Sequence, residues 1–223
     1  MKIVAFVPIK MNNERLPGKN TKSFDNGKPL ISYILETLEK VQGLDETYVY
    51  CSNDAICEYM PDSAKFLKRD TYLDLSTTSF NEVLSTFVER VDADYYILTH
   101  ATAPFISAET FEKAIEAIKS GEYDSALTVS ELKEFMWKDN QPINYSPDAI
   151  PRTQDLDPYY CETCGMYMFS KELMQKENRR IGHKPYLLTV SKIEALDVNE
   201  PIDFDICNAV YNMLKKEENN DKL

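Results

Sequence analysis

Apolar runs of strand length alternate along this chain with segments whose apolar residues recur at helical spacing. Residues 2–9 (KIVAFVPI) are almost continuously apolar, and in 29–41 apolar residues recur every three or four positions. The same alternation continues with strand-like runs at 46–52, 93–100 and 123–130 and helical patterns at 79–91 and 107–121. Strands that are apolar on both faces and separated by helices predict a mainly parallel, twisted sheet in a three-layer α/β/α architecture with right-handed crossovers.

Regular patterning stops between about residues 131 and 160, where four prolines interrupt a polar and aromatic stretch. Segments of this length inside a compact domain are usually lids, binding loops or assembly elements. Beyond it we expect strand-like runs at 165–173, 186–190 and 192–198, a closing helix at 201–216 with Pro201 in its first turn, and a frayed tail from residue 217. The pattern therefore predicts one domain over 1–223 with an inserted segment at about 131–160.

The net charge of −12 argues against a general attraction to nucleic acid or to anionic membranes. No apolar stretch approaches the length of a membrane span and the N-terminus lacks a small-residue cleavage signal, so we expect a cytoplasmic protein. Five cysteines, an odd number, favour reduced thiols. The spacing Cys161-Glu-Thr-Cys164 leaves two interpretations open: a zinc site that needs two further ligands, or two packing thiols.

A cationic loop follows the first strand of this acidic chain. Between Pro8 and Lys22 there are four Lys or Arg residues and one acid, Glu14. Ligands of open α/β sheets bind beyond the carboxyl ends of the strands, where this loop should meet the segments 68–81, 99–105 and 196–201. Cations beside Gly18, which lets the backbone approach a ligand, suit the phosphates of a nucleotide, and a solvated turn is the alternative. The loop has neither the P-loop pattern nor the Gly-x-Gly-x-x-Gly pattern.

The chain resembles the cytidylyltransferases that activate acylneuraminates and other 3-deoxy-2-keto sugar acids. Five segments follow in the order of that family: VPIKMNNERLPGKN, KRDTYLDLSTTSFNEVL, LTHATAPF, PRTQDLDPYYCETCGMYMF and EALDVNEPIDF. The resemblance implies the nucleotide-diphospho-sugar transferase (GT-A-like) fold. It also implies transfer of CMP from CTP to a sialic-acid-like sugar acid, with release of pyrophosphate, for cell-surface polysaccharide or glycoconjugate synthesis. A homodimer is implied as well, in which the segment at about 131–160 is a dimerisation element that reaches the partner's sugar site.

The same resemblance assigns roles to residues by position. Nucleotide binding falls to Pro8, Lys10, Asn12, Asn13, Lys19 and Asn20 around the phosphates, with Arg15 nearby, and to Arg69 and Ser79 around the base and ribose. Sugar binding falls to His100, Thr102, Arg152 and Gln154. Asp197 matches a magnesium ligand, and Asn199 stands at a second, weaker metal position. Lys19, Lys10 and Arg15 are the expected catalytic cations, because attack of a sugar hydroxyl on the α-phosphorus builds charge that cations and Mg²⁺ stabilise.

Some positions depart from the family pattern. Lys10 replaces an arginine, Glu14 adds an acid to the loop, His100 replaces a glutamine, and Asn199 stands in place of an aspartate. These departures leave two alternatives: a CTP- or CMP-binding sensor or partner protein without catalysis, and a nucleotidyltransferase with a different acceptor. Asp203 lies in the first turn of the last helix, where we expect it to cap the helix rather than bind metal.

Overall fold

Seven strands form one sheet in the computed structural model, which describes the backbone of residues 1–220 and the side chains of residues 1–217. The strand order is β3-β2-β1-β4-β8-β5-β9. The strands are β1 (Ile3–Ile9), β2 (Glu46–Cys51), β3 (Ala64–Lys68), β4 (Tyr95–Thr99), β5 (Ser125–Leu132), β8 (Tyr159–Ser170) and β9 (Pro185–Thr189). β8 runs antiparallel to its neighbours β4 and β5, and the other neighbouring pairs are parallel. The mainly parallel sheet predicted from the sequence is confirmed.

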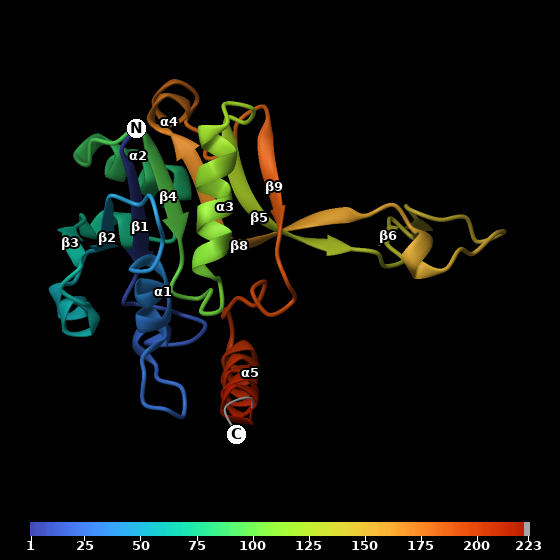
Figure 1. Ribbon diagram of the computed structural model, residues 1–223, viewed down its shortest axis with the longest axis horizontal. Coiled ribbons are helices and arrows are strands. Elements are labelled where there is room, and N and C mark those ends of the chain that lie inside the picture. Colours follow the sequence, from blue (N-terminus) through green and yellow to red (C-terminus); the bar gives the residue numbers. More distant parts are fainter. Residues whose placement is uncertain (221–223) are drawn as a thin grey trace.

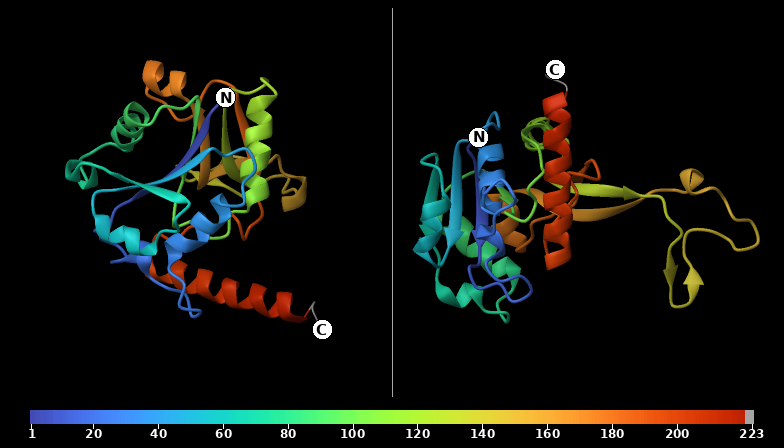
Figure 2. Two further views of the ribbon diagram at one scale, coloured as in Figure 1. Left: turned by 60° about the vertical axis from the view of Figure 1, so that its left-hand side comes forward. Right: turned by 90° about the horizontal axis from the view of Figure 1, so that it is seen from below.

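Helices cover both faces of this sheet (Figure 1). Helices α1 (Leu30–Leu38) and α3 (Ala108–Lys119) pack on one face, and α2 (Phe80–Arg90) and α4 (Lys171–Glu177) pack on the other. Helix α5 (Pro201–Asn220) lies beyond the carboxyl ends of the parallel strands (Figure 2). Short 3-10 turns are found at Lys19–Thr21, Asp54–Tyr59, Thr71–Asp74 and Thr153–Asp155. Along the part of the chain that is described, no helix combines the length and apolar character needed to cross a bilayer.

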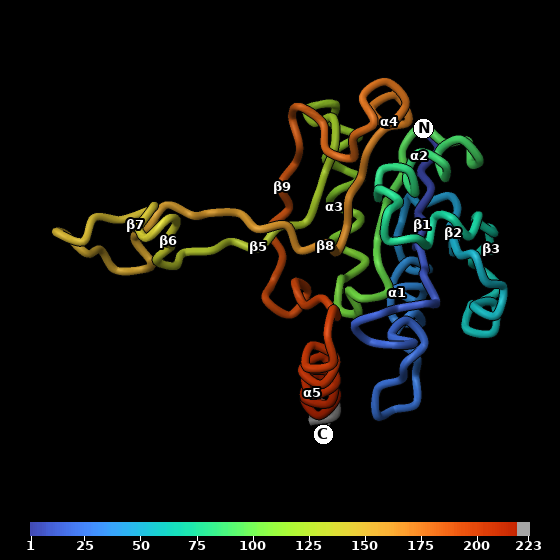
Figure 3. Tube along the Cα trace, turned by 180° about the vertical axis from the view of Figure 1, so that it is seen from behind, coloured from blue at the N-terminus to red at the C-terminus, as the bar shows by residue number. Residues whose placement is uncertain are grey.

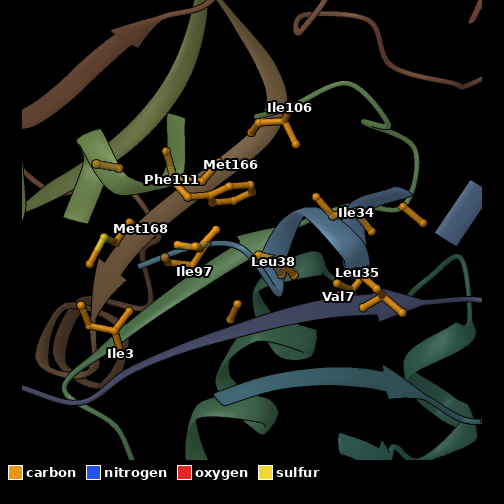
Figure 4. Packing of buried hydrophobic residues seen from close by; sticks show 14 of the residues in the cluster. Ile3, Val7, Ile34, Leu35, Leu38, Ile97, Ile106, Phe111, Met166 and Met168 are labelled. Atoms are coloured by element: carbon orange, nitrogen blue, oxygen red, sulfur yellow. The ribbon is translucent and has the colours of Figure 1, made fainter. Parts of the chain in front are cut away.

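Strand β1 is buried on both faces, which explains its continuous apolar sequence. Its odd-numbered residues from Ile3 to Ile9 join the cluster that contains α1 and α3, part of which is shown in Figure 4. On the opposite face Val4 and Phe6 join the cluster under α2, where Phe6 stacks on Phe87 with ring centroids 4.0 Å apart. The apolar run therefore reflects a central strand between two helical layers.

Strand β8 carries a bulge at the centre of the sheet. Glu162 and Tyr167 of β8 lie five positions apart, but they pair with Val129 and Leu127 of β5, which lie only two positions apart. The hydroxyl of Thr128 accepts hydrogen bonds from the hydroxyl of Thr163 at 2.8 Å and from the amide of Met166 at 3.0 Å, which fixes the bulge. Within it Cys164 has a φ of +58°, in the left-handed region that favours glycine and asparagine.

Strands β5 and β8 continue beyond the sheet as a two-stranded arm (Figures 1 and 3). They remain paired as far as Leu132 and Tyr159. Between these residues lie a small hairpin of β6 (Trp137–Lys138) and β7 (Gln141–Pro142) and the 3-10 turn Thr153–Asp155. The irregular segment expected at 131–160 is therefore a projecting arm with secondary structure of its own.

Four details of the fold differ from the sequence prediction. Strand β3 is not predicted from the sequence. Helix α4 begins at Lys171, inside the predicted strand 165–173, because Ser170 caps the helix by accepting a hydrogen bond from the amide of Leu173 at 3.0 Å. The predicted strand at 192–198 is wrong, since this segment consists of turns and irregular chain. Helix α5 continues to Asn220, and the end of the tail expected to fray, 221–223, lies outside the described residues.

Candidate active site

The loop after β1 is closed by a left-handed glycine. Gly18 has a φ of +66° and a ψ of 17°, and it leads the chain into the 3-10 turn. There the amide of Lys19 donates to the carbonyl of Leu16 at 3.2 Å, and that of Thr21 donates to the carbonyl of Gly18 at 3.0 Å. Glycine adopts this backbone at little cost, which explains its place in the loop. Pro8, a predicted nucleotide contact, lies in β1 directly before the loop.

Leu16 anchors this loop on the C-terminal part of the chain. Its side chain is only 6% exposed. It belongs to a small apolar cluster with Phe24, Leu30, Tyr33, Val198, Phe204 and Cys207. The cluster holds the loop beside the segment that leads into α5, although the two are about 180 positions apart in the sequence. The expected convergence of the opening loop with 196–201 is therefore confirmed.

Asn20 is buried and forms hydrogen bonds across the loop. Its Nδ2 donates to the carbonyl of Lys10 at 3.0 Å and, less closely, to Oδ1 of Asn13 at 3.5 Å. The sequence predicts that Asn20 contacts the nucleotide, whereas in the structure its amide nitrogen fixes the two sides of the loop to each other. These bonds shape the loop, and a direct contact of Asn20 with the nucleotide stays a prediction.

Lys19 extends from the 3-10 turn toward the segment before α5. Its Nζ donates to the carbonyl of Val198 at 3.0 Å. Burial lowers the pKa of Lys19, with Arg15 acting in the same direction and the carboxylate of Asp197 in the opposite one. Because its hydrogen-bond partner is a neutral carbonyl, the positive charge of Lys19 remains available to an anionic ligand.

Arg15, Asn199 and Asp197 form a short hydrogen-bonded row. Nη2 of Arg15 donates to Oδ1 of Asn199 at 3.4 Å, and Nδ2 of Asn199 donates to Oδ2 of Asp197 at 2.7 Å. The second carboxylate oxygen, Asp197 Oδ1, is buried and meets no hydrogen-bond partner among the described residues. Asp203 accepts the amides of Asn199 and Glu200 at 2.9 and 2.8 Å, so it caps the start of α5 as expected.

A cavity of about 310 Å³ opens over this loop. Its walls are formed by Lys10, Asn12, Asn13, Glu14, Arg15, Leu16, Lys19, Ser76 and Asn199. The structure thus brings together three predicted cations and three predicted asparagines, with the acid Glu14 among them. Ser76 is a wall residue that the sequence analysis missed, and its only signal was the Ser/Thr-rich run at 76–79, where the prediction selected Ser79.

Ser79 and Arg69, predicted to lie near the base and ribose, have structural partners. Ser79 is the N-cap of α2 and forms a capping box with Glu82. Arg69 is 5% exposed, and its Nε and Nη2 both donate to Oδ1 of Asp74. The ring of Tyr50 lies 5.8 Å from the guanidinium carbon. A direct contact of either residue with the nucleotide stays a prediction.

His100 and Thr102 follow β4 at the same edge of the sheet. The ring of His100 lies 5.8 Å from that of Phe80. Burial lowers the pKa of His100 to about 4, against the opposing effect of Asp197, so the imidazole is neutral at pH 7. The carbonyl of Thr102 accepts the amide of Val198 at 2.9 Å, which joins the loop after β4 to the segment that carries Asp197.

The arm projects away from the sheet (Figure 3). Arg152 and Gln154 lie on it, at the 3-10 turn Thr153–Asp155, and neither is among the walls of the cavity of their own chain. Nε and Nη2 of Arg152 donate to the two carboxylate oxygens of Asp155 at 2.7 and 3.0 Å. The carbonyl of Gln154 accepts from Nζ of Lys133 at 3.3 Å. A role for these residues in sugar binding therefore requires a second copy of the chain, as the sequence prediction supposes.

All five cysteines lie in the described part of the chain and are free thiols. Cys161 is exposed, and Cys164 is half-buried with the hydroxyl of Tyr167 donating to its sulfur at 3.7 Å. Within the described residues, no three His, Cys, Asp or Glu side chains gather as ligands for a metal ion. The further ligands that a zinc ion at Cys161 and Cys164 would need are therefore not found in this part of the chain.

A mainly parallel α/β sheet with a cationic loop and a partnerless carboxylate oxygen at its carboxyl edge is the arrangement of a nucleotide-binding α/β protein. A family model described as cytidylyltransferase matches residues 4–196, and the chain belongs to this family.

The two relatives and the solved structure described here are each between 18% and 27% identical to this chain. N-acylneuraminate cytidylyltransferase A of Danio rerio is 24% identical over 214 residues, which cover 92% of this chain and 49% of that protein. This chain thus spans about half the length of that relative. The 3-deoxy-manno-octulosonate cytidylyltransferase 2 of Hydrogenovibrio crunogenus is 27% identical over 91% of this chain and 88% of its own. A CMP-2-keto-3-deoxy-manno-octonic acid synthetase solved with CTP has the same fold, with a TM-score of 0.70 at 18% identity over 96% of this chain and 99% of its own.

Proposed function

We propose that this chain is an enzyme that transfers CMP from CTP to a sialic-acid-like sugar acid, nonulosonic or another 2-keto-3-deoxy acid, and releases pyrophosphate. The observation that carries the proposal is the cavity in which Lys10, Arg15 and Lys19 lie beside Asn199 and its partner Asp197, in a chain of the cytidylyltransferase family. The acceptor class is supported by the names of two relatives, which act on an N-acylneuraminate and on 3-deoxy-manno-octulosonate.

In this reaction an oxygen of the sugar forms a bond to the α-phosphorus of CTP, and the bond from that phosphorus to the oxygen bridging to the β-phosphorus breaks. Negative charge grows on the leaving pyrophosphate, and fixed cations stabilise it. Lys19 is held by the carbonyl of Val198 at 3.0 Å and is therefore oriented before a triphosphate arrives, and Arg15 lies beside it with one longer hydrogen bond, of 3.4 Å, to Asn199. Little reorganisation is then needed as the charge develops.

Asp197 is the residue that fits a magnesium ion. Its Oδ1 is buried without a hydrogen-bond partner among the described residues, and an ionised oxygen in that state is costly unless a cation meets it. Mg²⁺ prefers one or two carboxylate oxygens together with phosphate oxygens and water, which agrees with a lone carboxylate beside a phosphate cavity. When bound, the ion would neutralise charge on the phosphates of CTP.

The arm supports the proposal of a homodimer. It exposes large apolar side chains, namely Phe135, Trp137, Ile143, Ile150, Tyr159 and Tyr160. Exposed aromatic and aliphatic side chains on a projecting segment are typical of protein interaction surfaces. A second copy that covers this surface could receive Arg152 and Gln154 at its own sugar site. Sedimentation at micromolar concentration should give the mass of a dimer, and a monomeric mass would contradict this arrangement.

The activity is tested by pyrophosphate release from CTP and Mg²⁺ with a panel of sialic, legionaminic, pseudaminic and 3-deoxy-octulosonic acids. We expect release with at least one of these acids. No turnover with any of them by a folded protein would contradict the proposal. Tight CTP binding without product would instead indicate a nucleotide-binding sensor, and product with another acceptor would indicate a different nucleotidyltransferase.

Lys19→Ala tests the cavity itself. Removing a cation that stabilises transition-state charge should lower pyrophosphate release roughly 100- to 1,000-fold. Lys40→Ala is the matched control, because Lys40 is exposed in the turn after α1 and does not line the cavity. A near-normal rate in Lys19→Ala would remove Lys19 from the active site.

A further inference from the structure

We propose that Arg15, which donates to Asn199, supplies the positive charge that a second divalent cation would otherwise bring, so that this chain binds CTP with one metal ion, at Asp197. The inference rests on the proposed function, since it concerns the triphosphate cavity of that reaction. The permanent charge of Arg15 would balance the phosphate charge that a second ion would otherwise balance.

The polarity of the row from Arg15 to Asp197 is fixed by the groups at its two ends. A guanidinium can only donate hydrogen bonds, and an ionised carboxylate can only accept them. The amide of Asn199 must therefore turn its oxygen toward Arg15 and its nitrogen toward Asp197, and the distances of 3.4 and 2.7 Å show this order. The one oxygen that the side chain of Asn199 could offer a metal ion is thus already used by Arg15.

Few carboxylate oxygens remain for a second ion near Asp197. Divalent ions at phosphate-transfer sites are held by carboxylates together with substrate phosphates. Asp203 already binds the two amides that begin α5. Glu14 is the one other acid among the cavity walls, and within the described residues no three His, Cys, Asp or Glu side chains gather as metal ligands. Asp197 Oδ1 is left as the single buried oxygen without a partner in this part of the chain.

Fixed positive charge already lies beside Asp197. Lys19 donates to the carbonyl of Val198, the residue that follows Asp197, and Arg15 is joined to Asp197 through the side chain of Asn199. A second divalent ion at this place would be repelled by two cations that the fold holds in position. One ion, Lys19 and Arg15 can together balance most of the charge of a triphosphate.

The number of ions can be counted with Mn²⁺ and CTP in the absence of acceptor, so that no turnover occurs. With protein in excess over CTP, calorimetry and electron paramagnetic resonance should show one Mn²⁺ per bound CTP and the spectrum of an isolated ion. Two Mn²⁺ per CTP, with the magnetic coupling expected of ions about 4 Å apart, would overturn the inference. If Glu14→Gln then removed one of the two, Glu14 would be the second ligand.

Variants test whether Arg15 and Asn199 exclude the second ion. Arg15→Gln should keep one Mn²⁺ but weaken CTP binding in the presence of a chelator by roughly tenfold or more, since a charge-assisted contact is lost. The double variant Arg15→Gln/Asn199→Asp should gain a second, magnetically coupled Mn²⁺. Arg90→Gln is the matched control: it removes the same charge from the end of α2, where Nη1 donates to the carbonyl of Lys68 at 2.5 Å, and it should change neither quantity.

Failure of this inference can be told apart from failure of the proposed function. A chain that binds no CTP under any condition refutes both. CTP that is bound with two ions and converted to product refutes the single-ion inference alone. A double variant that stays at one Mn²⁺, or an Arg15→Gln variant that binds CTP as tightly as the parent, also refutes it, provided that circular dichroism shows the variants to be folded.

Discussion

Replacing Asn20 by alanine tests whether this side chain holds the loop together or contacts the nucleotide. Of its two hydrogen bonds, the one to the carbonyl of Lys10 at 3.0 Å has ordinary geometry, and the one to Asn13 at 3.5 Å is at the limit. One effective bond is therefore lost. Leaving a buried acceptor unsatisfied costs about 1–3 kcal/mol, and because Lys10 is only half-buried we expect the lower end, about 1 kcal/mol.

This loss should be visible in two independent measurements. The Tm of the ligand-free protein should fall by about 2–4 °C, the shift that 1 kcal/mol produces in a protein of this size. The kcat/KM for CTP should fall, by up to about fivefold, because a loop that is ordered for a smaller fraction of the time binds CTP in proportion to that fraction. Calorimetry of the ligand-free protein and pyrophosphate release at low CTP give the two values.

Asn12→Ala is the matched control, because Asn12 is an exposed asparagine on the wall of the same cavity. It should leave the Tm of the ligand-free protein unchanged. If Asn20→Ala also left that Tm unchanged while CTP affinity fell, Asn20 would be a direct nucleotide ligand and the reasoning from its hydrogen bonds would be refuted.

Other positions give sharp expectations. Gly18→Ala should lower the free energy of unfolding by about 1–2 kcal/mol, because the φ of Gly18 is +66°, and it should also weaken CTP binding. The control Gly121→Ala, at φ +74° and away from the cavity, should lower stability without changing CTP affinity. An equal loss of CTP affinity in both variants would contradict a local effect of Gly18. Cys164→Asn should raise the free energy of unfolding in urea by about 0.5–1 kcal/mol, because asparagine accepts the left-handed backbone more readily than cysteine, whereas an unchanged midpoint would show that the bulge is not strained. CTP affinity should be constant below the lowered pKa of Lys19 and should fall as the pH rises through it, since the ammonium loses its charge there. Lys19→Arg should move this fall in affinity to higher pH. An unchanged pH profile in the variant would exclude Lys19 as the cause of the fall.

The sequence predicts the central part of the sheet well because β1 is buried on both faces and therefore apolar throughout. It does not indicate β3, because that strand lies at the sheet edge and carries two lysines in five residues. It also cannot give the direction of β8, since burial on both faces produces the same apolar run in a parallel or an antiparallel strand. The helix α4 is too short to show a helical period of its own.

The sequence predicts which loops meet at the candidate site, because the order of the strand ends determines this. It does not predict which hydrogen-bond partners the side chains have there. Meeting of the opening loop with the segment around Asp197 follows from parallel topology. Ser79 caps α2 and Ser76 lines the cavity. These roles depend on the residue at which α2 begins, which the sequence of this serine-rich segment does not indicate. The hydrogen bonds of Asn20 within its own loop are equally invisible in the sequence.

Strands β5 and β8 each run from the sheet into the arm as one element, and the bulge of β8 lies between the two parts. At the root of the arm the hydroxyl of Thr128 joins the two strands through Thr163 and Met166. Its direction is set by the twist of the sheet, and the conformational entropy of holding it there is lost when the chain folds. Any molecule that the arm touches therefore meets a surface that the fold already orders, and association need not order it again.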